Sequence, residues 1–334
     1  MNQPTKIDRE IRWGIIGTGK IAHKFAEDLL RTPQGRLYAV ASRTTDKATT
    51  FARQYKAEVA YGSYEHIIED KQVDILYIAT PHPFHFEWTL KGLQHGKAVL
   101  CEKPMGMDAV QVQRLTDEAQ KQGLFLMEGL WTRFIPVFQK ALEALHSGQI
   151  GEPLLIRADF GFKGDGNLKS RIYNKSLGGG SLLDIGIYPL YLSLLVLGMP
   201  SKVQASARFT TTGVDSYCGM LLDYPSGAKA NLESTLEADT PIEAYIYGSK
   251  GKLKLHSRFH HPEQCTLTLE EGSQKIIEMA YSGNGYTHEI EEVHQCLRCG
   301  KTESDLLPLS VSLKLAKIMD QVKAAIGLNY STES

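Results

Sequence analysis

The chain has 334 residues, of which 42% are hydrophobic. A chain of this length is too long to fold around one ordinary hydrophobic core, so we predict two domains. Neither domain should need disulfide bonds to be stable. Its 37 basic and 38 acidic residues form no long run of either sign, which argues against nucleic acid or an anionic membrane as partner. We therefore expect a small-molecule partner.

The N-terminal stretch MNQPTKIDREIRWGIIG lacks the pattern of a signal peptide, and no uninterrupted apolar run reaches the length of a membrane span. We expect a cytoplasmic protein whose five cysteines are free thiols. Cys296 and Cys299 form a single CxxC. A metal or redox site is the alternative for that pair, but two helix thiols are favoured, and we expect no metal.

Residues 1–130 alternate short apolar β-rich runs with segments of helical length. The predicted strands are IRWGII, LYAVAS, EVAYG, VDILYIAT, KAVLCE and LFLMEG. This alternation predicts an α/β domain with a doubly wound parallel sheet of the Rossmann type. Its ligand crevice should lie at the carboxyl ends of the strands.

Residues 131–334 predict a second α/β domain, which binds substrate. After a linking helix near 134–147, longer strands joined by tight turns predict a large open sheet that is mainly antiparallel. Examples of these strands are EPLLIRADFGF, KVQASARFTTT, YCGMLLDY, AKANLEST, EAYIYG and GKLKLHS. Helices near 286–298 and 309–326 close the chain.

A glycine-rich turn, GTGKIA, follows the first strand directly. Gly17 suits a tight turn, Gly19 lets the backbone approach a pyrophosphate, and Ala22 is small enough for helix-to-strand packing. Two turn glycines without a ligand are the alternative, but the strand-to-helix position favours a dinucleotide site. The predicted cofactor-binding residues here are Gly17, Thr18, Gly19, Lys20 and Ile21.

The second strand ends in VASRTTDK, without the acid that an NAD site places on the ribose 2′-hydroxyl. Ser42 and Arg43 can hold a 2′-phosphate, with Lys47 as a further cation. NADP is therefore favoured over NAD. The alternative is a solvated arginine, with Asp46 at the ribose if the register differs by a few residues.

The fourth strand ends in IATPHPFH, which places Thr80, Pro81, His82 and His85 in the predicted crevice. Either histidine could carry a proton. The two prolines favour a rigid loop that forms the cofactor wall instead.

The fifth strand ends in VLCEKPMGMD, which puts Glu102 and Lys103 at the carboxyl end of a buried strand. Desolvation there could tune the lysine for proton transfer or for substrate polarisation. Taken alone, a surface ion pair is the more common explanation of such a dipeptide.

The segment GGGSLLDIGIYPLYLSLLVLG, residues 178–198, is built for burial yet holds Asp184 and Tyr188 four residues apart. Its glycines predict a close approach to a ligand and a helix N-terminus that favours an anion. Pro189 predicts a kink or a loosened hydrogen bond one turn earlier, beside Asp184. A membrane span is disfavoured because the run is short and contains an acid.

Together, the segments GTGKIA, CEKPM, GGGSLLDIGIY and HEIEEVHQCLRCGKTES resemble the Gfo/Idh/MocA oxidoreductases, from about residue 11 to 326. The segment MEGLWTRFIP, with Tyr188 where many members carry histidine, is similar to the subgroup of dimeric dihydrodiol dehydrogenases and NADP-dependent D-xylose dehydrogenases.

This resemblance implies hydride transfer between NADP and a carbinol carbon, and a homodimer formed through the C-terminal sheet. It also implies that Lys103 and Tyr188 lie beside the reacting oxygen, with Asp184 as the acid of the family's motif. The tyrosine in place of histidine makes a phenol the proton carrier. Glu102 and Lys103 are also counted with the cofactor-binding residues.

Aromatic and arginine side chains are typical of a site for a sugar ring or a flat diol. The predicted substrate contacts are Trp131, Arg133, Phe160, Arg171, Asp184 and Tyr188. Phe160 and Phe162 share one face of a strand, so burial in the core is an equal alternative for both.

The sequence thus predicts an NADP-dependent oxidoreductase acting on a cyclic polyol or aldose, such as D-xylose or D-glucose, or on a trans-dihydrodiol. One alternative is a non-catalytic NADP-binding sensor or co-repressor on the same fold. The other is an NAD-dependent glycosidase of the same superfamily.

Overall fold

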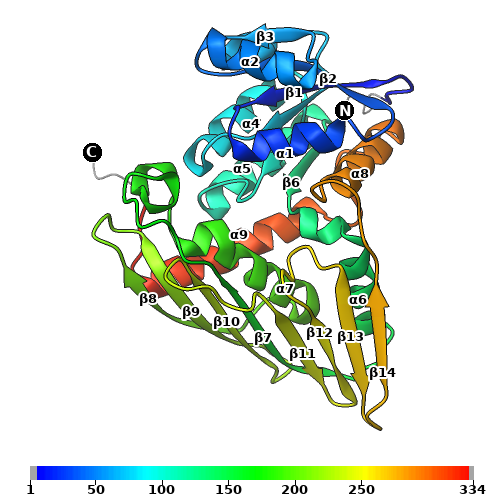
Figure 1. Ribbon diagram of the computed structural model, residues 1–334, viewed down its shortest axis with the longest axis vertical. Helices are drawn as coiled ribbons and strands as arrows, with labels where there is room; N and C mark the ends of the chain where they lie inside the picture. The colour runs from blue at the N-terminus through cyan, green and yellow to red at the C-terminus, as the bar shows by residue number, and fades with distance from the viewer. Residues whose placement is uncertain (1–5, 331–334) are drawn as a thin grey trace. The chain divides into compact units, whose positions relative to one another are not determined.

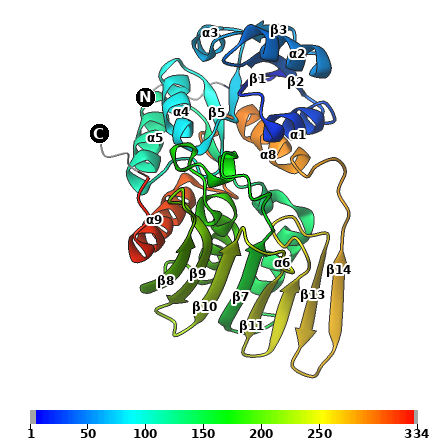
Figure 2. The same cartoon turned by 60° about the vertical axis from the view of Figure 1, so that its left-hand side comes forward.

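The computed structural model describes residues 6–330 of the chain. These residues divide into two compact units (Figures 1 and 2). The first unit runs up to residue 134 and adds 282–313, and the second comprises 135–281 and the chain from 314 onward. The chain therefore passes between the units three times.

The first unit contains a parallel sheet of six strands in the order β3-β2-β1-β4-β5-β6. The strands are β1 Ile11–Ile16, β2 Gly35–Ala41, β3 Val59–Tyr61, β4 Ile75–Ile78, β5 Ala98–Glu102 and β6 Leu126–Gly129. The helices are α1 Lys20–Leu29, α2 Thr45–Tyr55, α3 Tyr64–Glu69, α4 His85–Gln94, α5 Ala109–Gln122 and α8 Thr287–Arg298, with short 3₁₀ turns η1 His82–Phe84 and η2 Trp131–Phe134. The predicted doubly wound parallel sheet is confirmed.

The strand order reverses between β1 and β4, which makes the carboxyl ends of these strands a topological switch point. The loops that follow β1, β4 and β5 all leave the same edge of the sheet because the strands are parallel. In open α/β sheets ligands bind at this edge.

Helix α8 belongs to the first unit, although the sequence analysis placed residues 282–313 in the second domain. The reason is a set of buried polar contacts between segments that are far apart in sequence. The carboxylate of Asp28, which is fully buried, accepts hydrogen bonds from the amides of Asn284 at 2.9 Å and Tyr286 at 2.8 Å. Hydrophobic periodicity carries no information about such contacts.

A second long-range contact joins Trp13 on β1 to His294 on α8. The indole N–H of Trp13 donates to Nε2 of His294 at 2.9 Å, and His294 is only 4% exposed. Burial lowers the pKa of His294 from 6.5 to about 4. The ring is therefore neutral in the folded chain at neutral pH.

We expect acid to destabilise the chain through His294. Its folded pKa is lowered, so its contribution to stability is complete above pH 6.5 and is lost as the pH falls towards 4. The free energy of unfolding should fall over this window by up to about 3 kcal/mol from this group. Urea denaturation of wild type and His294→Gln, which keeps an acceptor for Trp13 but does not titrate, measures the difference. Equal pH dependence in both proteins would contradict it.

The second unit contains a sheet of eight strands in the order β14-β13-β12-β11-β7-β10-β9-β8. The strands are β7 Pro153–Gly161, β8 Lys202–Phe209, β9 Asp215–Asp223, β10 Lys229–Thr235, β11 Ala244–Gly248, β12 Gly251–Leu255, β13 Gln264–Leu269 and β14 Gln274–Glu278. Only β7 and β10 pair in parallel, so the prediction of a large, mainly antiparallel sheet is confirmed. Strands β13 and β14 were not among those predicted.

Helices α6 Pro136–His146 and α7 Ile187–Leu197 pack against one face of this sheet (Figure 1). The short turns η3 Arg171–Tyr173 and η4 Lys175–Leu177 precede α7, and helix α9 Leu309–Ile326 ends the chain. Alternate side chains of the central strands, such as Ile156, Leu232 and Ile246, are buried towards the helices.

The segment 175–197 is long and apolar enough to cross a membrane by length and composition. However, 78% of its most apolar stretch is buried inside the protein, as expected for a core helix. Residues Leu182–Gly186 form a π-helical turn directly before α7, in which the amide of Asp184 lies 3.4 Å from the carbonyl of Gly180. The loosened hydrogen bonding that Pro189 predicted beside Asp184 is therefore present.

The glycines that precede this turn, Gly179 and Gly180, lie in close contact with other parts of the protein. A Cβ at Gly179 would lie 2.7 Å from the carbonyl oxygen of Arg171, and one at Gly180, where φ is +114°, would lie 2.2 Å from Oδ1 of Asp215. Oδ2 of Asp215 accepts from Ser181 Oγ and from the amide of Leu182, both at 2.7 Å. The anion at this helix N-terminus is thus a buried carboxylate of the chain itself.

Candidate active site

The residues predicted to act on cofactor and substrate fall into two groups, one in each unit. The first group lies at the carboxyl edge of the parallel sheet. The second lies on the helix-covered face of the antiparallel sheet. Each group is described within its own unit.

The glycine-rich turn after β1 has the local geometry that its sequence predicts. Gly17 has φ of +99°, and a Cβ there would lie 2.7 Å from the carbonyl oxygen of Ala79 after β4. A Cβ at Gly19 would meet nothing within 4 Å, and no side chain caps the N-terminus of α1. Ala22 is fully buried. The turn thus leaves free amides and open space where a pyrophosphate would bind.

The end of β2 presents a buried hydroxyl and an exposed cation. The hydroxyl of Ser42 lies 3.2 Å from that of Thr18, which ties this loop to the glycine-rich turn. Arg43 is exposed, and within residues 6–330 its guanidinium makes no hydrogen bond or ion pair. Lys47 and Asp46 lie in the first turn of α2 and are also exposed.

The loop after β4 combines an unpaired hydroxyl with buried histidines. Oγ1 of Thr80 is buried and has no hydrogen-bond partner in the described chain. Pro81 precedes η1, in which His82 is 5% exposed. His85 begins α4 and is 1% exposed, with its two ring nitrogens near the carbonyl oxygens of Thr80 and Pro104.

At the end of β5, Glu102 is buried and Lys103 is half-buried. Oε1 of Glu102 accepts a hydrogen bond from the hydroxyl of Tyr77 on β4, and Oε2 accepts from the amide of Lys103 at 3.2 Å. These buried contacts rule out the alternative of a surface ion pair at the strand end. Glu102 therefore positions the backbone of Lys103.

Two further buried acids lie near this loop. Oε1 of Glu128 on β6 accepts from the amide of Met105 at 2.8 Å. Both carboxyl oxygens of Glu289 on α8 are buried without a partner in residues 6–330, and one lies 3.6 Å from the place of a Cβ on Gly129. Burial raises the pKa of Glu128, and it raises that of Glu289 well above its usual range. Their spacing in the sequence gives no signal of this cluster.

Two predicted substrate contacts, Trp131 and Arg133, lie in η2 of the first unit. The ring of Trp131 stacks on Tyr286, with 4.7 Å between centroids and an interplanar angle of 7°. Nε of Arg133 donates to the carbonyl of Leu306 at 2.8 Å. Part of the Arg133 donor capacity is therefore used to hold a loop of its own unit.

In the second unit, Arg171 and Asp184 form an ion pair. Nη2 of Arg171 lies 2.8 Å from Oδ1 of Asp184, whose side chain is 14% exposed. Nη1 of Arg171 is buried and has no partner in the described chain. One donor of the guanidinium thus orients the acid, and another remains for a polar ligand.

Tyr188, on the first turn of α7, contacts aromatic rings from the sheet. Its centroid lies 5.7 Å from that of Phe160 on β7 and 5.0 Å from that of His260, which follows β12. Phe160 and His260 stack at 4.4 Å, and all three side chains are less than 9% exposed. Phe162, one residue past the end of β7, is half-buried. Sequence reasoning missed His260, because a histidine in a turn between strands carries no signal.

The residues of the first unit fit a dinucleotide. The open approach at Gly19, the uncapped amides of α1 and the unpaired hydroxyl of Thr80 offer donors and space, and Arg43 offers a cation. In the described residues, no group of three or more His, Cys, Asp and Glu side chains is placed to hold a metal ion. The cysteines have free thiols.

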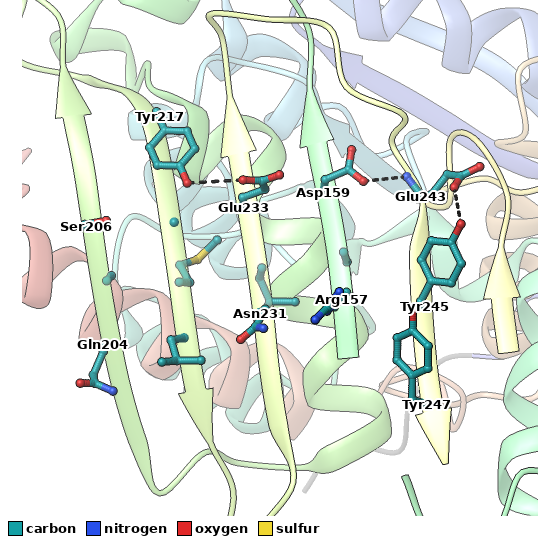
Figure 3. A pocket seen from close by; sticks show the side chains of 16 residues that line it. Arg157, Asp159, Gln204, Ser206, Tyr217, Asn231, Glu233, Glu243, Tyr245 and Tyr247 are labelled. Carbon is teal, nitrogen blue, oxygen red and sulfur yellow. Dashed lines mark hydrogen bonds between the residues drawn. The ribbon is translucent and has the colours of Figure 1, made fainter. Parts of the chain in front are cut away.

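The outer face of the second unit's sheet holds a shallow hollow of about 750 Å³ (Figure 3). Its lining residues come from β8, β9, β10, β7 and β11 and from Glu243 just before β11. The dashed lines in Figure 3 join Tyr217 to Glu233 and Tyr245 to Glu243. The hollow lies on the face opposite to Tyr188, because Ala158 and Phe160 point to the helices while Arg157 and Asp159 line the hollow.

Comparison with known proteins identifies the family to which the two parts of this chain are similar. Residues 11–130 match the oxidoreductase family with an NAD-binding Rossmann fold, and residues 138–254 match the GFO/IDH/MocA C-terminal domain. Trans-1,2-dihydrobenzene-1,2-diol dehydrogenase from Mus musculus is 36% identical over 329 residues, which cover 96% of this chain and 98% of that protein.

Solved structures agree in fold over nearly the whole chain. A 3-ketoreductase from Actinomadura kijaniata, in complex with NADP and TDP-benzene, has a TM-score of 0.86 at 28% identity and covers 95% of this chain and 98% of its own. An aldose-aldose oxidoreductase from Caulobacter crescentus, complexed with glycerol, has a TM-score of 0.86 at 26% identity. The match covers 95% of this chain and 97% of that protein. The chain therefore belongs to the Gfo/Idh/MocA family of oxidoreductases, as the motifs of its sequence indicate.

Proposed function

We propose that this protein is an NADP-dependent dehydrogenase that oxidises a carbinol carbon of a cyclic polyol, an aldose such as D-xylose or D-glucose, or a trans-dihydrodiol. The observation that carries the proposal is Lys103, half-buried at the carboxyl end of β5 with its amide bound to buried Glu102. One relative named above is a dihydrodiol dehydrogenase and another is an aldose-aldose oxidoreductase, which supports this class of substrate.

NADP, held by the glycine-rich turn and Arg43, would supply the acceptor for the hydride of the carbinol carbon. In the proposed reaction the hydroxyl proton of the substrate passes to the phenolate oxygen of Tyr188, and Lys103 acts at the same substrate oxygen, as the family resemblance implies. Asp184, oriented by Arg171, accepts a hydrogen bond from a second substrate hydroxyl. Phe160 and His260 form an apolar wall beside Tyr188, which suits the face of a ring.

The proposal is tested by following absorbance at 340 nm with NADP⁺ and a panel of aldoses, cyclic polyols and dihydrodiols. We expect net formation of NADPH with at least one of them. No net reduction with any compound would overturn the proposal and favour a non-catalytic sensor. Release of sugar from a glycoside without net redox would favour a glycosidase.

The preference for NADP rests on Arg43. We expect Arg43→Ala to raise the dissociation constant of NADPH by about tenfold or more and to leave that of NADH within about threefold, because only NADPH has a 2′-phosphate for the guanidinium to bind. Fluorescence titration of both cofactors measures the two constants. Lys56→Ala, which removes an exposed cation at the other end of α2, is the matched control. An equal loss for both cofactors would contradict the role.

We also propose that the protein forms a homodimer through the open face of its eight-stranded sheet. This face combines tyrosines, an arginine and exposed Leu221, residue types that are common in interfaces. Leu221→Arg should convert the dimer to a monomer in sedimentation velocity at micromolar concentration. Val110→Arg, on exposed α5, should leave the dimer intact. A monomeric wild type, or a dimeric Leu221→Arg, would overturn the proposal.

A further inference from the structure

The backbone that carries Lys103 is held on both sides by buried carboxyl groups. The amide of Lys103 donates to Glu102 at 3.2 Å, and the amide of Met105 donates to Glu128 at 2.8 Å. Glu102 is 7% exposed and Glu128 is 3% exposed. The residue between them, Pro104, has no amide proton and offers its carbonyl oxygen as an acceptor.

His85 stands opposite that carbonyl. Its Nδ1 lies 2.8 Å from the carbonyl oxygen of Pro104, and its Nε2 lies 2.7 Å from the carbonyl oxygen of Thr80. The side chain is 1% exposed. One imidazole ring thus joins the loop after β4 to the loop after β5, the two loops that bound the proposed cofactor site.

These two contacts define the protonation state of the ring. A carbonyl oxygen can only accept hydrogen bonds, and a neutral imidazole has a single N–H. Either neutral tautomer would therefore set a nitrogen lone pair against an oxygen lone pair at under 3 Å in a buried place. Only the imidazolium donates to both Thr80 and Pro104.

His294 shows the opposite case in the same unit. It is buried to a similar degree, but its Nε2 accepts from the N–H of Trp13 and so carries no proton. Burial and the N–H donor of Trp13 both favour the neutral ring at His294, whereas two carbonyl acceptors face the ring of His85.

Several ionisable groups lie around His85. Those on the elements packed against α4 are Tyr77 on β4, Cys101 and Glu102 on β5, His82 on η1, Arg114, Asp117, Glu118 and Lys121 on α5, and Tyr64, Glu65, His66 and Glu69 on α3. The buried carboxyl groups Glu102 and Glu128 lie in or bind the loop that His85 contacts, and their ionised forms favour the imidazolium, but burial raises the pKa of Glu128, so the two carbonyl contacts carry the inference. Arg114 lies over the ring of Phe86, 5.1 Å from its centroid.

We propose that His85 is a permanently protonated tether that fixes the Lys103–Pro104 backbone to the loop after β4 and thereby positions the Lys103 side chain. It is a positioning residue, which acts through Lys103. The catalytic consequence rests on the proposed function, whereas the charge of the ring does not.

The charge is tested by NMR of the full chain with ¹⁵N-labelled histidine. At about pH 8, where an exposed histidine is neutral, we expect one histidine with protons on both ring nitrogens, assigned to position 85 by sequential correlation in wild type and by its absence in His85→Gln. His95, exposed at the end of α4, serves as internal reference. A single protonated nitrogen at His85 would overturn the proposal, whatever the protein's activity.

The tether is tested by kinetics with a substrate found in the panel. Glutamine cannot bridge both carbonyls, so His85→Gln should lower kcat by about tenfold or more, with a smaller change in the KM of the substrate. His95→Gln should behave as wild type. Unchanged turnover in His85→Gln, with a charged ring in wild type, would overturn the positioning role. Wild type without turnover on any substrate would overturn the proposed function and leave the NMR result decisive for the charge.

Discussion

Replacement of Lys103 by methionine is expected to lower kcat by a factor of about 10² to 10⁴, the usual contribution of a positioned proton-transfer group. Methionine has a similar length but no charge, so the substrate oxygen would lose the ammonium of residue 103. The amide of residue 103 would still bind Glu102, because that contact uses the backbone. Steady-state kinetics and the dissociation constant of NADPH measure the two effects separately.

We expect the affinity for NADPH to stay within about threefold in Lys103→Met, since the phosphates bind elsewhere. Lys91→Met is the matched control, because Lys91 is exposed on α4 and pairs with Glu87 at 2.7 Å. Its turnover should equal that of wild type. A Lys103→Met enzyme with normal turnover would refute the assignment.

Tyr188→Phe is expected to lower kcat by about 10² or more while the protein remains folded. The ring is 7% exposed and contacts Phe160 and His260 through its faces and edges, and phenylalanine keeps those contacts. Only the hydroxyl is lost. The variant therefore separates proton transfer from packing.

The pH dependence of kcat is the sharper readout for Tyr188→Phe. If the phenolate of Tyr188 accepts the proton, the acidic limb of the profile, where protonation of that base lowers the rate, should disappear in the variant, and the residual rate should vary little with pH. Tyr191→Phe, three residues along the same helix and fully buried, is the control and should keep the wild-type profile. A Tyr188→Phe profile identical to wild type would show that Lys103 acts without the tyrosine.

Much of the fold follows from hydrophobic periodicity in the sequence. The run IRWGII is β1 from Ile11 to Ile16, and the last helix spans 309–326 as predicted. Strand β13 was missed although buried Cys265 and Leu267 alternate with half-buried threonines, a signal of period two that is present in QCTLTL. Strand β14 carries no such pattern and forms by pairing with β13.

The site could be predicted only where local geometry demands a residue type. Gly17 needs a positive φ and cannot carry a Cβ, so its role is readable in the sequence. The positions of His260 and Glu289 depend on contacts between segments that are far apart in the sequence. No periodic pattern of residues in the sequence indicates such contacts. The glycines before Asp184 were read as a path for a ligand, whereas the structure uses them for close contact with the backbone of Arg171 and the carboxylate of Asp215.

The first unit is discontinuous in the sequence, and this has a consequence for synthesis on the ribosome. The buried carboxylate of Asp28 receives its donors from residues 284 and 286, and the amide of Leu126 on β6 pairs with the carbonyl of Thr302. When residue 134 emerges, the nucleotide-binding sheet still lacks these partners. The first unit to be translated can therefore complete its fold only after residues 135–281 of the second unit have been made.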